Sequence, residues 1–202
     1  ELNNQGIPCI EPRKLTGTER VVGGTAWKLC LPDLADQFDL LVVDEAGQLS
    51  LANLLAMARC ANSILLVGDQ QQLAQPSKAD HPGDAGQSCL GYLMGADQAV
   101  VSKDQGVFLP VSWRMEPSLT ALVSELFYEA RLHAHQGNCA NCIEWAKPFQ
   151  NHAGLLLPGQ GLVFEAVEHS GRSVHSPEEI DRIEQLVDAL LGSRYAIARG
   201  NR

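Results

Sequence analysis

Long apolar segments are missing from this chain of 202 residues. None reaches the roughly 18 to 20 residues that a membrane-spanning helix needs. The opening stretch, "ELNNQGIPCIEPRK", has neither the basic start nor the apolar segment of a signal peptide. Internal repeats and low-complexity tracts are missing too. These absences predict a soluble intracellular protein, located in the cytoplasm or in the nucleoid or nucleus.

Positive charge is scarce as well. Fifteen Lys and Arg residues face 24 Asp and Glu residues, which gives a net charge of −9. Such a balance argues against binding nucleic acid by overall charge, although a local basic groove is compatible with it. The six cysteines are mostly scattered, and in a cytosolic chain they indicate small core residues rather than a disulfide framework. Hydrophobic residues make up 45% and charged residues 19%, a globular composition.

Two aliphatic segments that end in acidic residues stand out among the features that are present. "FDLLVV" (38–43) precedes Asp44 and Glu45, and "SILLVGD" (63–69) ends in Asp69. Continuous apolar runs of this kind predict strands covered on both faces. The segment 49–61 between them has helical composition, so the three form a βαβ unit with parallel strands. The acids then leave the same edge of one sheet, where open α/β sheets bind ligands.

The rest of the chain predicts further α/β structure. "EPSLTALVSELFY" forms a helix with Pro117 in its first turn, and "SPEEIDRIEQLVDALL" forms another, capped by Ser176 with Glu179 reaching back. Strands are expected at 106–113 and 161–167, and loops at 76–88 and 133–142. We expect an irregular lead-in (1–19), one α/β domain (20–109) and the start of a second (110–202).

"VVDEAGQ" (42–48) has the form of a Walker B motif. Nucleotide hydrolysis needs Mg²⁺ on the phosphates and a group that orients or deprotonates water. Asp44 would hold the Mg²⁺ and Glu45 would serve as the base; alternatively, both are surface acids. In "VGDQQQLAQ" (67–75), Gln72 could sense the γ-phosphate without adding repulsion, or the glutamines could form a solvated loop.

"VSWRMEPSL" (111–119) places an aromatic ring and a cation at a predicted strand–helix junction. Arg114 could neutralise charge that develops on a transferring phosphoryl group. Trp113 could stack on a base. Taken singly, Trp113 is also compatible with a core position and Arg114 with a surface charge.

Together, "VVDEAGQ", "VGDQQQLAQPS" and "SWRMEPSLTALVSELFYEARL" resemble motifs II, III and IV of the superfamily 1 helicases, in the branch of the nonsense-mediated-decay helicase. "VVGGTAW" resembles that branch's nucleic-acid-contacting motif, and "QSCLGYL" the short helix after motif III. The resemblance covers residues 20–192. It implies two partial, tandem RecA-like domains of the P-loop NTPase fold, with a parallel sheet flanked by helices.

The resemblance also implies residue roles. Asp44 would be the Mg²⁺ ligand, Glu45 the catalytic base, Gln72 the γ-phosphate sensor and Arg114 the arginine finger. Three further residues would bind the nucleotide: Gln48, Asp69 and Trp113, the last standing where the family usually has tyrosine. Thr25 would contact a backbone phosphate of single-stranded or duplex DNA or RNA. ATP and Mg²⁺ are the implied cofactors.

A phosphate-binding loop, G-x-x-x-x-G-K-[ST], occurs nowhere in the chain, since "GGTAWK" (23–28) has neither its spacing nor its final Ser or Thr. Motifs V and VI are missing too. We therefore expect the middle of a longer ATP-dependent helicase or translocase, inactive without its N- and C-terminal parts and unable to bind ATP tightly. Two alternatives stay open: a P-loop NTPase with a signalling or assembly role, and a non-catalytic scaffold that has lost its P-loop.

One more cluster consists of potential metal ligands. His133, His135, Cys139 and Cys142 form H-x-H-x₃-C-x₂-C, whose residue types could hold zinc. Structural zinc sites usually separate their ligand pairs more widely. Exposed histidines in a polar loop are the alternative.

Overall fold

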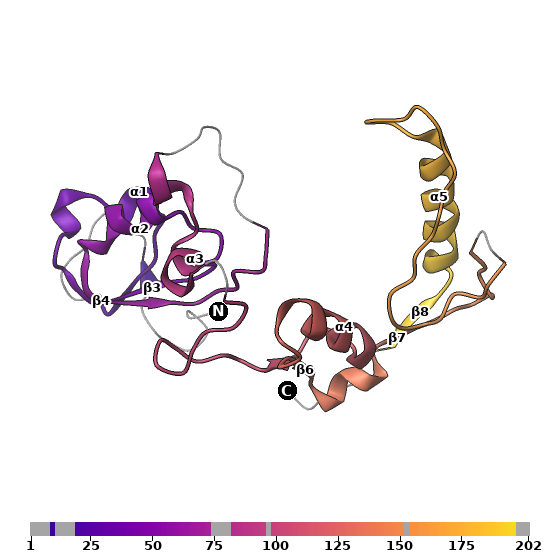
Figure 1. Cartoon of the computed structure of the whole chain (residues 1–202), viewed down its shortest axis with the longest axis horizontal. Helices are drawn as coiled ribbons and strands as arrows, with labels where there is room; N and C mark the ends of the chain where they lie inside the picture. Colours follow the sequence, from indigo (N-terminus) through magenta and orange to yellow (C-terminus); the bar gives the residue numbers. More distant parts are fainter. Residues whose placement is uncertain (1–8, 11–18, 74–81, 96–97, 152–153, 197–202) are drawn as a thin grey trace. The chain divides into compact units, whose positions relative to one another are not determined.

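The computed structural model describes residues 9–10, 19–73, 82–95, 98–151 and 154–196. The chain divides into two compact units, Glu1–Val101 and Ser102–Arg202. Figure 1 shows the helices and strands of each unit, which are described separately below. Among the described residues, no helix has both the length and the apolarity needed to cross a membrane.

The first unit combines short helices with parallel strand pairs. Its elements are β1 (Cys9–Ile10), β2 (Val21–Val22), α1 (Ala26–Leu29), the 3₁₀ helix η2 (Pro32–Leu34), β3 (Phe38–Val43), α2 (Leu51–Ala58), β4 (Ala61–Leu66), the 3₁₀ helix η3 (Gly83–Gly86) and α3 (Cys89–Met94). β1 pairs with β2, and β3 pairs with β4, in both cases in parallel.

The predicted βαβ unit is confirmed in β3, α2 and β4. The two strands pair in register from Phe38 opposite Ala61 to Val43 opposite Leu66. The Ser50 hydroxyl caps α2 by accepting a hydrogen bond from the backbone N–H of Asn53 at 3.3 Å. Because both strands run the same way, the segments that follow them leave the sheet at one edge.

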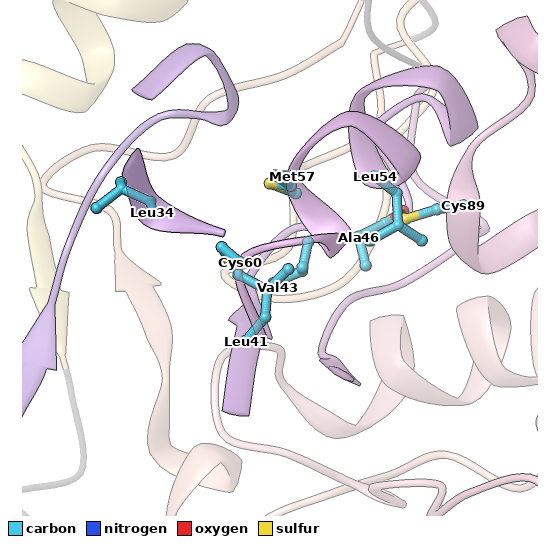
Figure 2. Close-up of a cluster of buried hydrophobic side chains, with 8 residues drawn as sticks. All are labelled: Leu34, Leu41, Val43, Ala46, Leu54, Met57, Cys60 and Cys89. Atoms are coloured by element: carbon cyan, nitrogen blue, oxygen red, sulfur yellow. Dashed lines mark hydrogen bonds between the residues drawn. The ribbon is translucent and has the colours of Figure 1, made fainter. Parts of the chain in front are cut away.

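The hydrophobic core of this unit covers one face of the β3–β4 pair. Leu41 and Val43 are buried with Leu54 and Met57 of α2 in a single cluster, which Figure 2 shows. Their neighbours on the opposite face are exposed: Leu40 by 49% and Val42 by 55%. The expectation that this strand is covered on both faces is therefore wrong for the described residues, because α2 packs on one side and no described element buries the other.

The second unit has two further strand pairs and two longer helices. Its elements are β5 (Val111–Ser112), α4 (Pro117–Phe127), β6 (His133–Ala134), the 3₁₀ helix η4 (Gln136–Ala140), β7 (Cys142–Glu144), α5 (Pro177–Leu191) and β8 (Arg194–Ala196). β5 and β6 are parallel, whereas β7 and β8 are antiparallel.

Capping residues set the starts of α4 and α5, as the sequence predicts. Pro117 opens α4, and the carboxylate of Glu116 accepts hydrogen bonds from backbone N–H groups of the first turn. Ser176 caps α5 by accepting from the N–H of Glu179 at 3.3 Å. The Glu179 carboxylate contacts His169 Nε2 at 2.9 Å, instead of reaching back to the cap as expected.

Three element predictions for the second unit are wrong. Residues 161–167 are irregular, because no described strand runs beside them to complete a ladder; Glu165 there pairs with Arg182 of α5 at 2.8 Å. Only Val111 and Ser112 of the expected strand 106–113 are paired. The expected loop 133–142 contains β6, η4 and the start of β7. The α/β class itself is confirmed.

Candidate active site

A tight turn after β3 presents the two acids of "VVDEAGQ". Asp44 and Glu45 are both exposed. The backbone N–H of Glu45 donates to Asp44 Oδ1 at 3.0 Å, and the N–H of Gln48 donates to the carbonyl of Glu45 at 2.8 Å. Glu45 has φ of 55°, a left-handed conformation that costs a residue with a Cβ roughly 1–2 kcal/mol. The surrounding contacts must therefore hold this turn.

Backbone contacts with the segment after β4 do so. The N–H of Ala46 donates to the carbonyl of Val67 at 2.9 Å, and the N–H of Val67 donates to the carbonyl of Val43 at 2.8 Å. Two glycines permit this approach. A Cβ on Gly47 would lie 2.0 Å from the carbonyl oxygen of Asp69, and one on Gly68 would lie 2.6 Å from the nitrogen of Ala46. Side chains are thus excluded at both positions.

The short helix α3 supports the same turn from the core side. Ala46 is fully buried, and its carbonyl accepts hydrogen bonds from the Cys89 thiol at 3.2 Å and from the N–H of Leu90 at 3.4 Å. Figure 2 shows Ala46 beside Leu54 and Cys89. Burial raises the pKa of the Cys89 thiol, which favours its uncharged, donating form. Both the N–H and the carbonyl of Ala46 are therefore held by hydrogen bonds.

The glutamine-rich segment after β4 is only partly solvated. Asp69 Oδ1 accepts from the N–H of Gln71 at 3.0 Å, and the side-chain amide of Gln70 donates to the carbonyl of Gln98. Gln72 is exposed in the turn that follows. The two parallel strands therefore bring Asp44 and Glu45 to the same sheet edge as Asp69, with Gln72 three residues further along.

The donor set at this edge suits Mg²⁺. Mg²⁺ keeps several waters and is usually held by one or two carboxylates together with substrate phosphates. Asp44 is an exposed carboxylate in a fixed turn, so it fits this role. The described residues contain no group of three acidic, histidine or cysteine side chains that could bind a metal ion.

In the second unit, the turn between β5 and α4 carries Trp113 and Arg114. Both side chains are exposed, Trp113 by 72%. The indole stacks on the imidazole of His135, with ring centroids 3.7 Å apart and planes inclined by 18°. Arg114 forms no ion pair with any residue that the structure describes. One turn therefore presents an exposed aromatic ring and an exposed cation.

A buried asparagine holds this turn. The side-chain amide of Asn138, which is 6% exposed, donates to the carbonyls of Ser112 at 2.9 Å and Met115 at 2.8 Å. The Ser112 hydroxyl accepts from the N–H of Met115 at 3.3 Å. Sequence reasoning missed Asn138, as it missed Gly47 and Gly68. Because the two glycines lie beside the acids in the sequence, they could have been predicted to permit a close backbone approach there. Asn138 could not, because it lies more than 20 residues from its hydrogen-bond partners.

Two further expectations concern Thr25 and zinc. Thr25 is exposed at the start of α1, and its side chain makes no capping hydrogen bond, so the hydroxyl is open to a ligand. The potential zinc ligands are not brought together: no set of three such residues is assembled in the described parts of the chain. His135 instead stacks on Trp113 and accepts from the N–H of Gly137 at Nδ1.

Comparison with known proteins identifies helicases as relatives. A family described as "AAA domain" matches residues 13–76. The chain is 33% identical over 126 residues to the 5'-3' DNA helicase ZGRF1 of Mus musculus. The alignment covers 59% of this chain and 6% of the relative. It is 33% identical over 109 residues to the DNA replication ATP-dependent helicase/nuclease DNA2 of Xenopus laevis. That alignment covers 53% of this chain and 10% of the relative.

A third relative is aligned over a longer part of the chain. The DNA-binding protein SMUBP-2 of Rattus norvegicus is 29% identical over 167 residues, which is 76% of this chain and 16% of the relative. The chain therefore spans between 6% and 16% of the length of these relatives. The similarity to superfamily 1 helicases that the motifs predict is confirmed.

Proposed function

This chain is a relative of the superfamily 1 helicases, and from that premise we propose that it is part of an ATP-dependent helicase or translocase that moves on nucleic acid. The first unit supplies the magnesium-binding and catalytic acids. The second unit supplies the arginine that neutralises the transferring phosphoryl group. The remaining parts of the nucleotide site belong to segments of the longer protein outside this sequence.

One observation carries this proposal: the turn after β3 and the segment after β4 are joined at one sheet edge. The hydrogen bond from Ala46 to Val67 and the side-chain-free positions Gly47 and Gly68 make the joint rigid. At this edge Glu45 has φ of 55°, a left-handed conformation that the joined segments hold. Strained backbone at the end of a strand is typical of sites where side chains must be aimed.

Each residue then has a task that its position permits. Bound ATP and Mg²⁺ would supply the phosphoryl group and the charge that polarises it. Asp44 holds the cation and Glu45 accepts the proton of the attacking water. Gln72 responds to the presence of the γ-phosphate. Gln48 and Asp69 bind the nucleotide, and Trp113 stacks on a base. Arg114 neutralises the charge that develops on the transferring phosphoryl group.

Nucleic acid is the proposed track. The relatives are named as DNA helicases or as a DNA-binding protein, which favours DNA over RNA for this chain. Thr25, with its exposed hydroxyl, would contact a backbone phosphate. The net charge of −9 requires that such contacts be local, since the chain as a whole repels a polyanion.

The test is ATP hydrolysis by the full-length protein, with and without a single-stranded DNA oligonucleotide. We expect the oligonucleotide to stimulate hydrolysis. Glu45→Gln removes the base but keeps the shape of the side chain, so kcat should fall by about 10²–10⁴-fold with little change in KM for ATP.

A matched control is Asp39→Asn. Asp39 is an exposed acid on the same strand, β3, and its replacement should leave both constants unchanged. Equal hydrolysis by Glu45→Gln and the unmodified protein would contradict the assignment. If hydrolysis depends on Glu45 but neither this oligonucleotide nor an RNA oligonucleotide of the same sequence stimulates it, the protein is instead an NTPase with a signalling or assembly role.

A further inference from the structure

The segment 133–138 has a use other than metal binding. Three of its groups contact the turn that carries Trp113 and Arg114. The backbone N–H of His135 donates to the carbonyl of Ser112 at 2.9 Å, the His135 ring stacks on the indole of Trp113, and the Asn138 amide donates to carbonyls on both sides of the turn. The segment thus forms a scaffold for one exposed aromatic side chain.

The position of the His135 ring is itself fixed. Its Nδ1 accepts a hydrogen bond from the N–H of Gly137 at 3.1 Å. This bond assigns the neutral tautomer, with the proton on Nε2. The imidazole is half-buried and covers one side of the indole. The 72% exposure of Trp113 leaves the rest of its surface open to a ligand.

We propose that His135 is a positioning residue that holds the Trp113 ring from one side, so that the open side stacks on a nucleobase. This inference rests on the proposed function, in which Trp113 contacts a base. The base belongs either to ATP or to a nucleic-acid strand, and both present the same planar, aromatic chemistry.

The physical reason is preorganisation. A largely exposed tryptophan without a neighbour samples several rotamers and loses that freedom when it binds. Stacking on His135 restricts the ring before the ligand arrives, so less conformational entropy is lost on binding. A nucleobase on the open side of Trp113 would form a stack of three rings with His135. Aromatic rings favour such offset stacking.

The experiment uses the full-length protein and four variants: Trp113→Ala, His135→Ala, His135→Phe and His133→Ala. His133 is the matched control, because it is an exposed histidine in β6 two residues from His135. The measurements are KM for ATP, kcat, and the concentration of a single-stranded oligonucleotide that gives half-maximal stimulation. Thermal unfolding of each variant checks that it folds.

We expect His135→Ala to raise one of the two half-saturation constants by about three- to tenfold, with kcat retained. His135→Phe should restore the value, because a flat ring again backs the indole, and His133→Ala should match the unmodified protein. An effect on KM for ATP assigns the base to the nucleotide, and an effect on the oligonucleotide constant assigns it to the strand.

Three outcomes would overturn the inference, and they can be told apart. If Trp113→Ala raises a half-saturation constant but His135→Ala does not, the stacking role of Trp113 stands and the role of His135 fails. If Trp113→Ala changes neither constant, the assignment of Trp113 in the proposed function fails, and the inference fails with it. Loss of kcat alone in His135→Ala would also contradict a role in base stacking.

Discussion

The turn that carries Asp44 and Glu45 and the turn that carries Trp113 and Arg114 are held in different ways. The first is joined to its neighbour by backbone hydrogen bonds and by glycines that leave no room for a Cβ. The second is held by side chains, through the Asn138 amide and the His135 ring. Both turns follow a strand and present exposed functional groups.

Because of this difference, the two turns should tolerate different substitutions. A turn held by backbone contacts accepts most side-chain changes but no added bulk at its glycines. A turn held by side chains is sensitive to the loss of one amide or one ring. The first arrangement suits acids whose positions must not vary, and the second holds an aromatic ring and a cation that remain exposed.

The largest effect should come from Gly47→Ala. Its Cβ would lie 2.0 Å from the carbonyl oxygen of Asp69, and a backbone atom cannot move aside without breaking the contact between the two segments. We expect a loss of about 3 kcal/mol or more in the free energy of unfolding, measured by urea titration of the chain.

Gly192→Ala is the control for that substitution. A Cβ added at Gly192 would lie 3.8 Å from its nearest neighbour, the carbonyl oxygen of Ala189, and the φ of −82° suits any residue. Stability should stay the same or rise by less than about 1 kcal/mol. If the two alanine variants unfold at the same urea concentration, the close approach at Gly47 is not a feature of the protein.

A smaller loss is expected from Asn138→Ala. The substitution leaves the carbonyls of Ser112 and Met115 without their buried donor, which costs about 1–3 kcal/mol. The exposed Asn62 on β4 provides a control, since Asn62→Ala should change stability by less than about 0.5 kcal/mol. Thermal unfolding of the whole chain distinguishes them, and an Asn138→Ala variant as stable as Asn62→Ala would show that the turn is held by other contacts.

The smallest effect is a pH dependence at the start of α4. Partial burial acts to raise the pKa of Glu116, but hydrogen bonds from the Ser118 hydroxyl and from the N–H groups of Ser118 and Leu119 together lower the pKa. A lowered pKa in the folded state gives stability that is present above the ordinary carboxyl pKa and is lost as the pH falls through the folded value.

Glu116→Gln tests this pH dependence. The variant should lose less stability than the unmodified chain between neutral and acidic pH, as measured by urea unfolding at a series of pH values. Ser50→Ala, at the cap of α2, removes a hydroxyl that does not titrate and that accepts a hydrogen bond from the backbone N–H of Asn53. It should therefore lower stability at every pH without changing the slope. Parallel pH profiles for Glu116→Gln and the unmodified chain would rule out the carboxylate as the cause.

Much of the first unit could be predicted from the sequence because its signals are local. Aliphatic runs that end in acids define β3 and β4, and the helix between them forces a parallel pair. In the second unit, Pro117 and Ser176 likewise predict where the helices α4 and α5 begin. Placing Asp44, Glu45 and Asp69 on one edge needed no more than this topology.

The remaining features depend on contacts between distant residues. Residues 161–167 are apolar enough for a strand, yet no described strand lies beside them, and the stretch packs against α5 through Glu165 and Arg182. Nothing near Asn138 in the sequence indicates that it donates to Ser112 and Met115. His135 looked like a metal ligand because residue type was the only available guide, and stacking on Trp113 is a tertiary property.

Hydrogen exchange at the backbone amides of Ala46 and Val67, followed by NMR on this chain, tests most directly whether the two acidic segments share one sheet edge. Both amides donate to carbonyls of the neighbouring strand or turn. They should exchange as slowly as the amides inside the β3–β4 ladder, and far more slowly than the N–H of the exposed Gly24. Exchange of Ala46 and Val67 at the rate of an open loop would show that the segments are not joined, and would remove the basis for a catalytic site there.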